Sequence, residues 1–134
     1  MINVEKRLDE FTEMHNGFIR DWNIAMNSGD TSSVERMAED YYVAFFNSGN
    51  EKPIFFTRQE AIQGMEQSVR HFTGAKKKFE NRVIRLRDNE NAVVFYEQIV
   101  VKDENVVARL FTIENWKLIN EKWMVIREIE ESIQ

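Results

Sequence analysis

Cysteine is absent from the sequence, and its absence excludes three kinds of chemistry at once. Without thiols the chain forms no disulfides, builds no Cys-based zinc site and has no thiolate nucleophile. This composition suits a reducing compartment, so a cytoplasmic protein is predicted. A single proline in 134 residues leaves no linker that would divide the chain, and residues 1–134 are expected to form one domain.

Long apolar runs and an excess of basic residues are also missing. No apolar run approaches the roughly 20 residues of a membrane span, and the N-terminus lacks the apolar core of a signal peptide. The net charge of −5 argues against nucleic acid, because binding there rests on neutralising phosphates. The basic run at residues 76–78 opens a predicted strand and is interpreted as a solvated guard of a sheet edge. Neither nucleic acid nor a membrane is expected as a partner.

Motifs for cofactors and metals are not found in the sequence. It holds no Gly-rich phosphate loop, no dinucleotide fingerprint and no Ser-His-Asp order. Its two histidines, His15 and His71, lie far apart, and no Glu-rich ligand spacing accompanies them. The expectation is therefore no cofactor and no metal.

Apolar residues at spacings of three and four predict helices in the N-terminal half. One apolar face runs over residues 4–25, and Gly29 is placed to end that helix as a left-handed cap. A second, shorter helix is predicted over residues 30–38, with an aspartate as its N-cap. A third helix opens at residues 57–60, which have the capping-box spacing, and ends at Gly74.

Runs rich in β-branched and aromatic residues predict the strands. The last three are the longest and follow one another directly, which indicates an antiparallel sheet. Helices on one face of such a sheet define an α+β fold. The predicted strands are 41–46, a short 53–56, about 77–87, 92–102, 106–119 and 122–129, with two-residue turns at 104–105 and 120–121.

The register of the last three strands decides which side chains share a face. These turns set Glu97 opposite Thr112 and Glu114 opposite Arg127, so that all four lie on one otherwise apolar face. That face holds two tryptophans and is assigned to the helix side. The opposite face is apolar as well, and three helices can cover only one side, so it is predicted to pair with a second copy of the chain. One residue more or fewer in either turn would exchange the faces.

Several local signatures follow one another in the order of a known superfamily. They are Trp22 and Ala25 with Asn27-Ser28-Gly29-Asp30, Met37-Ala38-Glu39-Asp40, Gln59-Glu60-Ala61-Ile62, and Phe111-Thr112 through Trp116 with Trp123 seven residues later. In these features the chain resembles the nuclear transport factor 2-like superfamily, in particular its SnoaL-like small domains, over nearly its whole length. The resemblance implies a cystatin-like fold, in which a curved sheet surrounds a conical cavity closed by the long helix. It also implies a homodimer through the back of the sheet.

Members of this superfamily include ketosteroid isomerases, scytalone dehydratase, polyketide cyclases, epoxide hydrolases and non-catalytic scaffolds. None of their catalytic sets carries over to this chain. The epoxide hydrolases use two aspartates and an arginine on the sheet, which Glu97, Glu114 and Arg127 match only in chemical type. Many SnoaL-like members end with a histidine in the last strand, and residues 125–129 contain none. The resemblance therefore specifies a fold and not a function.

Glu97, Glu114 and Arg127 are the candidate catalytic residues. On the predicted face they form the floor of a pocket, where apolar walls or like charge raise the pKa of one carboxyl and Arg127 keeps the other ionised. The alternative is structural: Glu114 and Arg127 form a cross-strand ion pair, and Glu97 bonds to Thr112 or to water.

Each candidate ligand-binding residue likewise has either a functional or a purely structural role. His15 stands where an apolar residue is expected, and it is either a general base over the cavity mouth or a histidine bonded at the core edge. The aromatic and methionine side chains either line a pocket or pack in the core, two roles that overlap in this fold. The set is His15, Trp22, Tyr41, Phe45, Met65, Thr112, Trp116 and Trp123.

The sequence thus predicts a protein that binds a small, largely apolar organic molecule inside a cone-shaped domain. If it is an enzyme, the expected chemistry is cofactor-free proton transfer of the isomerase, dehydratase, cyclase or hydrolase type. The alternative is a non-enzymatic scaffold that uses the same fold for dimerisation or interaction. An open cavity with inward carboxylates would favour the first hypothesis, and a cavity filled by aromatic side chains would favour the second.

Overall fold

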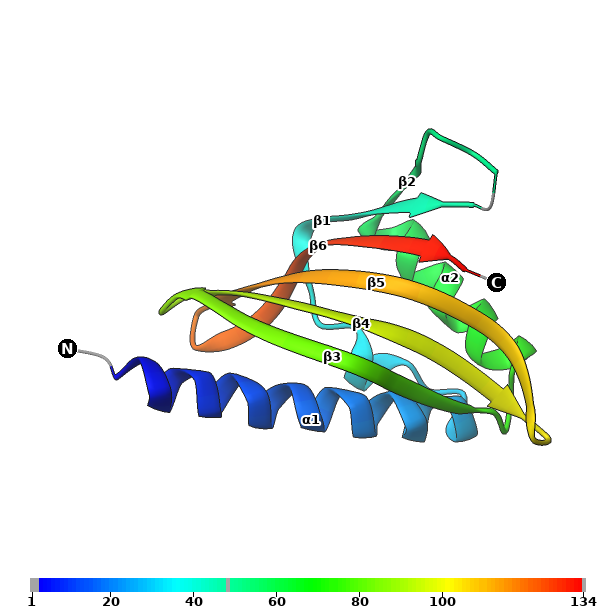
Figure 1. Ribbon diagram of the computed structural model, residues 1–134, viewed down its shortest axis with the longest axis horizontal. Coiled ribbons are helices and arrows are strands. Elements are labelled where there is room, and N and C mark those ends of the chain that lie inside the picture. The colour runs from blue at the N-terminus through cyan, green and yellow to red at the C-terminus, as the bar shows by residue number, and fades with distance from the viewer. Residues whose placement is uncertain (1–2, 48, 134) are drawn as a thin grey trace.

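The computed structural model describes residues 3–47 and 49–133, which form two α-helices, a short 3₁₀ helix and a six-stranded sheet (Figure 1). The predicted α+β class is confirmed. None of the helices in these ranges is long and apolar enough to cross a membrane. In chain order the elements are α1 (Val4–Ser28), η1 (Ser32–Val34), β1 (Met37–Phe46), β2 (Ile54–Thr57), α2 (Arg58–His71), β3 (Lys76–Asp88), β4 (Asn91–Lys102), β5 (Asn105–Ile119) and β6 (Lys122–Ser132).

The end of α1 and the start of α2 lie where their capping residues predict, whereas α2 ends at His71 and not at the predicted Gly74. Gly29 adopts the left-handed conformation with φ 81°, and its N–H donates to the carbonyl of Ala25 at 2.8 Å, which ends α1. At the start of α2 the backbone N–H of Glu60 donates to the Thr57 hydroxyl, and the Glu60 carboxylate accepts from the Thr57 N–H at 3.0 Å. The capping box is therefore confirmed.

The predicted second helix, over residues 30–38, is wrong. Only Ser32–Val34 form a 3₁₀ turn, and β1 already begins at Met37. The carboxylate of Asp30 accepts from the N–H of Ser32, which closes a local turn in place of an α-helical start. So short a segment also gives a helix too few hydrogen bonds to offset nucleation.

The sheet is mixed and not purely antiparallel, in contrast to the prediction. Its strand order is β2-β1-β6-β5-β4-β3, and β1 pairs with β6 in parallel while the other neighbours are antiparallel. The parallel pair arises because the last strand returns beside the first one and not at the edge of the sheet. The sheet is bent, with α1 lying along β3 and α2 against β1, and these two helices enclose the concave side (Figure 1).

Single-residue bulges shift the register of the long strands. The first turn lies at Asp103 and Glu104, one residue earlier than predicted, while the turn at Asn120 and Glu121 is as predicted. Val107 is then an extra residue in β5, since Val101 pairs with Val106 and Val100 pairs with Ala108. Ile126 is extra in β6 in the same way. Each bulge exchanges the two faces of the strand beyond it.

One end of the concave side is filled by a cluster of buried aromatic rings. Phe11 packs edge-on against Trp123 with ring centroids 4.9 Å apart, and Phe18 packs edge-on against Trp116 at 5.1 Å. His15 lies between these pairs and is fully buried. This cluster fixes α1 to the sheet, and an open space remains beyond it, next to α2.

Candidate functional site: a cavity with carboxyl groups on its sheet side

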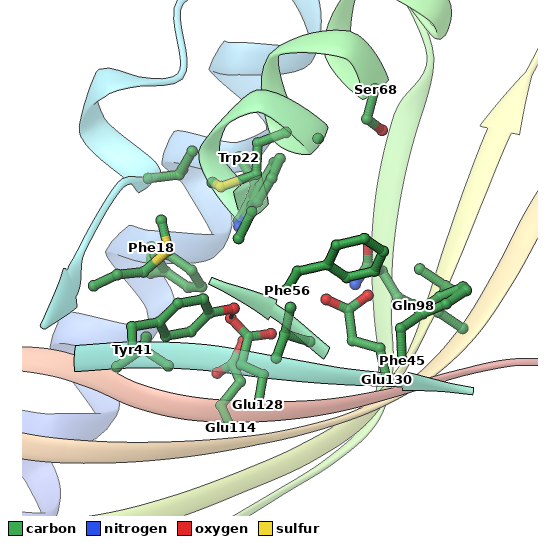
Figure 2. Close-up of a pocket in the computed structure, with 18 of the residues that line it drawn as sticks. Phe18, Trp22, Tyr41, Phe45, Phe56, Ser68, Gln98, Glu114, Glu128 and Glu130 are labelled. Atoms are coloured by element: carbon green, nitrogen blue, oxygen red, sulfur yellow. Dashed lines mark hydrogen bonds between the residues drawn. The ribbon is translucent and has the colours of Figure 1, made fainter. Parts of the chain in front are cut away.

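A cavity of about 300 Å³ lies between the sheet and the two α-helices (Figure 2). Its walls come from α1, α2 and every strand, and most of the lining is apolar. Such a volume and lining are typical of sites for small organic ligands. The aromatic residues of the wall are Phe18, Trp22, Tyr41, Phe45, Phe56 and Tyr96.

Glu114 is the most deeply buried acid of the cavity, with 1% of its surface exposed. One carboxylate oxygen accepts from Nε2 of His15 at 2.9 Å and from Nε1 of Trp116 at 2.8 Å. The other accepts from the hydroxyl of Tyr96. A carboxyl group that accepts from three donors and donates to none is in its ionised form.

The hydrogen bond from Arg82 shows which ring nitrogen of His15 carries the proton. Nη1 of Arg82 donates to Nδ1 of His15 at 3.0 Å, and a guanidinium has no acceptor to offer in return. The imidazole is therefore neutral, with its proton on Nε2 and directed at Glu114. Arg82 reaches this position because β3 contains a bulge there: Asn81, with φ 56°, and Arg82 together oppose Tyr96. The cationic guanidinium thus balances the buried anion through a neutral histidine.

Three further acids line the cavity: Glu60 of α2, whose carboxylate caps the start of that helix, and Glu128 and Glu130 of the sheet. Glu128 and Glu130 lie two residues apart on β6, so both point to the concave side, and Figure 2 shows them beside Tyr41 and Phe56. The Tyr41 hydroxyl donates to Glu128 at 2.9 Å. Burial, followed by the charges of Glu130 and Glu114, raises the pKa of Glu128 well above its usual range, and burial also raises the pKa of Glu130. Burial and these acids likewise raise the pKa of Tyr41, which stays a hydroxyl donor.

Lys77 brings a single amine into this cavity. It is 7% exposed, and its Nζ lies 3.4 Å from the centroid of the Trp22 ring. Burial lowers the pKa of Lys77 to about 8, although Glu130 and Glu128 oppose the change. The prediction that residues 76–78 form a solvated guard is wrong for Lys77, because alternation along β3 exposes only its two neighbours.

The three candidate catalytic residues do not lie together. Glu114 faces the cavity, but Glu97 pairs with Phe111 and lies on the outer side of the sheet. Arg127 is exposed and points outward, next to the inward Glu128. The bulge at Val107 separates Glu97 from Glu114, and the bulge at Ile126 turns Arg127 away. The predicted shared face is therefore wrong, and so is the alternative ion pair between Glu114 and Arg127.

The candidate ligand-binding residues divide into two groups. Trp22, Tyr41, Phe45 and Met65 line the cavity. The remaining four do not reach it: His15, Thr112 and Trp116 are buried behind its wall, and Trp123 borders a separate, shallow hollow beside Met14.

Sequence reasoning missed Glu128, Glu130, Tyr96 and Lys77 as site residues. The sequence held one signal for the two acids. Glu128 and Glu130 are two residues apart across the end of the last predicted strand and so share a face, and a register shift of one residue turns that face toward the interior. In residues 3–47 and 49–133 no group of three or more His, Cys, Asp or Glu side chains is arranged to hold a metal ion.

Comparison with solved structures identifies the fold. A cystatin-like protein of unknown function from Nostoc punctiforme superposes with TM-score 0.70 and 20% identity, covering 94% of this chain and 92% of that one. An NTF2-like protein from Novosphingobium aromaticivorans superposes with TM-score 0.73 and 14% identity, covering 97% and 86%. A candidate ketosteroid isomerase from Parabacteroides distasonis gives TM-score 0.59 and 15% identity, covering 87% and 85%.

The chain therefore has a cystatin-like fold, similar to that of solved NTF2-like proteins, and the fold that the sequence signatures implied is confirmed. The sequence itself matches no protein-family model and no curated protein. At these identities the likeness concerns the fold, and the function has to be argued from the cavity.

Proposed function

We propose that the protein binds a small, largely apolar organic molecule in the cavity between α1, α2 and the sheet. The supporting observation is an open volume of about 300 Å³ that is lined by aromatic side chains and by three carboxyl groups of the sheet. Aromatic side chains have not filled this space, which disfavours a purely structural interior. SnoaL-like membership and a cytoplasmic location are part of the same proposal.

Cofactor-free acid–base catalysis is the further step that the carboxyl groups support. Burial raises the pKa of Glu128 and of Glu130, so both keep their protons to higher pH than ordinary carboxyls and are suited to donate a proton to a bound molecule. Glu114 remains an anion and stabilises positive charge that develops nearby. This division of roles replaces the predicted set of Glu97, Glu114 and Arg127.

Gly64 offers a direct test of binding. It lies on the cavity-facing side of α2, at the mouth, and a Cβ built there meets no atom within 4 Å. Gly64→Leu should obstruct the cavity while stabilising the helix by about 0.5–1 kcal/mol. Native mass spectrometry against a panel of small apolar alcohols, ketones and amines should show complexes with wild type and lose them with this variant.

Gly17→Ala is the matched control, because it removes a helical glycine of α1 that does not line the cavity. This variant should gain similar stability and keep wild-type binding. Equal binding by wild type, Gly64→Leu and Gly17→Ala would show that the molecules bind elsewhere, and the proposal would fail.

We also propose that two copies pair through the outer face of the sheet. Phe95, Phe111 and Ile113 are only half-buried there, and Ile129 is 39% exposed. No helix covers this face in the described part of the chain, so a second copy would remove apolar surface from water. The scaffold alternative would rest on the same face, without use of the cavity.

A further inference from the structure

We propose that Lys77 forms a Schiff base with the carbonyl group of an aldehyde or ketone bound in the cavity. This inference rests on the proposed function, because the carbonyl compound has to enter the same space. It assigns a reacting atom, Nζ of Lys77, and a chemical class of ligand.

The side chain of Asn23 fixes the backbone of Lys77 through two hydrogen bonds. The N–H of Lys77 donates to Oδ1 of Asn23 at 3.0 Å, and its carbonyl accepts from Nδ2 of the same asparagine at 3.1 Å. One side chain of α1 therefore holds both backbone groups of the residue. This clamp directs the lysine side chain into the cavity wall, where the residue is 93% buried.

The amine itself is left available for reaction. Within the described residues no carboxylate lies within 4.0 Å of Nζ, and no hydrogen bond involves it. Its neighbour is the face of the Trp22 ring, which attracts a cation but blocks no lone pair once the proton has left. Desolvation favours the neutral amine, which is the nucleophilic form, and it lowers the pKa of Lys77 to about 8.

The acids required for the reaction face the same space. The Nζ lone pair forms a bond to the carbonyl carbon, the oxygen takes a proton from the carboxyl of Glu128 or Glu130, and that carboxylate removes a proton from the nitrogen. The same carboxyl then protonates the hydroxyl, the C–O bond breaks, and water leaves. Amine, carbonyl compound and carboxylic acid give iminium, water and carboxylate, with no oxidant or reductant.

The product is stabilised where it forms. The iminium cation lies over the Trp22 face and shares the cavity with the newly ionised carboxylate, which attracts it across the low-dielectric space. Lys76 and Lys78 are exposed on the two sides of Lys77 and lack this environment. They are internal controls within one strand.

The test traps the imine in the intact protein. Wild type is incubated with benzaldehyde, hexanal or cyclohexanone and sodium cyanoborohydride at pH 6–9, and the modified lysines are located by peptide mass spectrometry. Lys77 should be labelled more than about tenfold faster than Lys76 or Lys78 at pH 7.5, since far more of its amine is unprotonated there. Its labelling rate should rise with pH and level off above about pH 8.

Two variants and one non-covalent probe separate the outcomes. Lys76→Arg should leave labelling of Lys77 unchanged, and Glu128→Gln should slow it while benzyl alcohol still binds. Labelling of Lys77 no faster than of its neighbours, with benzyl alcohol bound in the cavity, would overturn the Schiff base and leave the proposed function standing. Failure of benzyl alcohol and all three carbonyl compounds to bind would contradict both.

Discussion

At the scale of single residues, the main feature is the carboxylate of Glu114, which is buried and hydrogen-bonded through both oxygens. Glu114 is surrounded by His15, Trp116 and Tyr96, each of which donates to it. These donors and Arg82 form one network with one neutral histidine in the middle. A buried polar network stabilises a fold only while each of its polar groups has a hydrogen-bond partner and each charge has a counter-charge.

Removing the charge of Glu114 should therefore be costly. Glu114→Gln leaves the Arg82 charge without its counterpart and mismatches one of the three donors, so the free energy of unfolding should fall by about 3 kcal/mol. Urea denaturation measures the change. Glu97→Gln, on the outer face, should change stability by no more than about 0.5 kcal/mol. Equal losses in the two variants would contradict the register described above.

Glu128 should make stability depend on pH. Its pKa is raised on folding, so the unfolded chain loses this proton near the ordinary pKa of 4.5 while the folded chain keeps it. The free energy of unfolding should then fall as pH rises above 4.5, by up to about 1.4 kcal/mol per pH unit for such a group. The fall ends when the folded-state pKa is reached.

Glu128→Gln cannot ionise, and its amide oxygen can still accept from Tyr41. The variant should be more stable than wild type at pH 7 by about 1 kcal/mol or more, with a shallower dependence on pH. Denaturant midpoints between pH 4 and 8 measure this. The neighbouring Glu131 is exposed, so Glu131→Gln should keep the wild-type slope. A Glu128→Gln curve parallel to wild type would rule out a raised pKa at Glu128.

At the scale of elements, the sequence predicted where helices and strands lie better than how the strands pair. Gly29 and the Thr57–Glu60 capping box are local signals that satisfy backbone groups within a few residues, and both helix boundaries follow from them. Bulges depend on contacts between strands. Val107 and Ile126 are β-branched residues like those around them, so nothing local marks them as extra.

The bulge in β3 is a partial exception, because it contains Asn81 in the left-handed region. Asparagine tolerates that conformation and β-branched residues do not. Asn81→Val should lower the free energy of unfolding by about 1–2 kcal/mol, while Asn81→Gly should stay within about 0.5 kcal/mol of wild type. Urea denaturation of the pair measures the strain. If Asn81→Val left the free energy of unfolding unchanged, Asn81 would not adopt the left-handed conformation, and the bulge would not be what places Arg82 against His15.

At the scale of the whole molecule, the order of elements predicted an α+β domain, and the resemblance to the nuclear transport factor 2-like superfamily implied the curved sheet with an internal cavity. The identity of its polar residues was not predictable in the same way. Glu97 and Glu128 differ only in which side of the sheet they face, and two single-residue bulges decide that. A fold is set by many residues, whereas a site depends on the position of a few.

The outer face gives a prediction about assembly. Ile113→Glu places a charge at the centre of the proposed interface and should convert a dimer into a monomer, as measured by light scattering after size-exclusion chromatography. Ile24 on α1 is 61% exposed, and Ile24→Glu should leave the dimer intact. A wild-type monomer, or a dimer unaffected by Ile113→Glu, would remove this interface.

The mainly apolar cavity holds two carboxyl groups, of Glu128 and Glu130, whose pKa is raised above its ordinary value by burial. Carbon-13 NMR of the glutamate side-chain carboxyls across a pH titration tests this central claim most directly. Two resonances should titrate above 4.5, the one lost in Glu128→Gln well above it and the other lost in Glu130→Gln, and both should shift when a small apolar molecule binds. Titration of every glutamate near 4.5, with no response to such molecules, would contradict the claim.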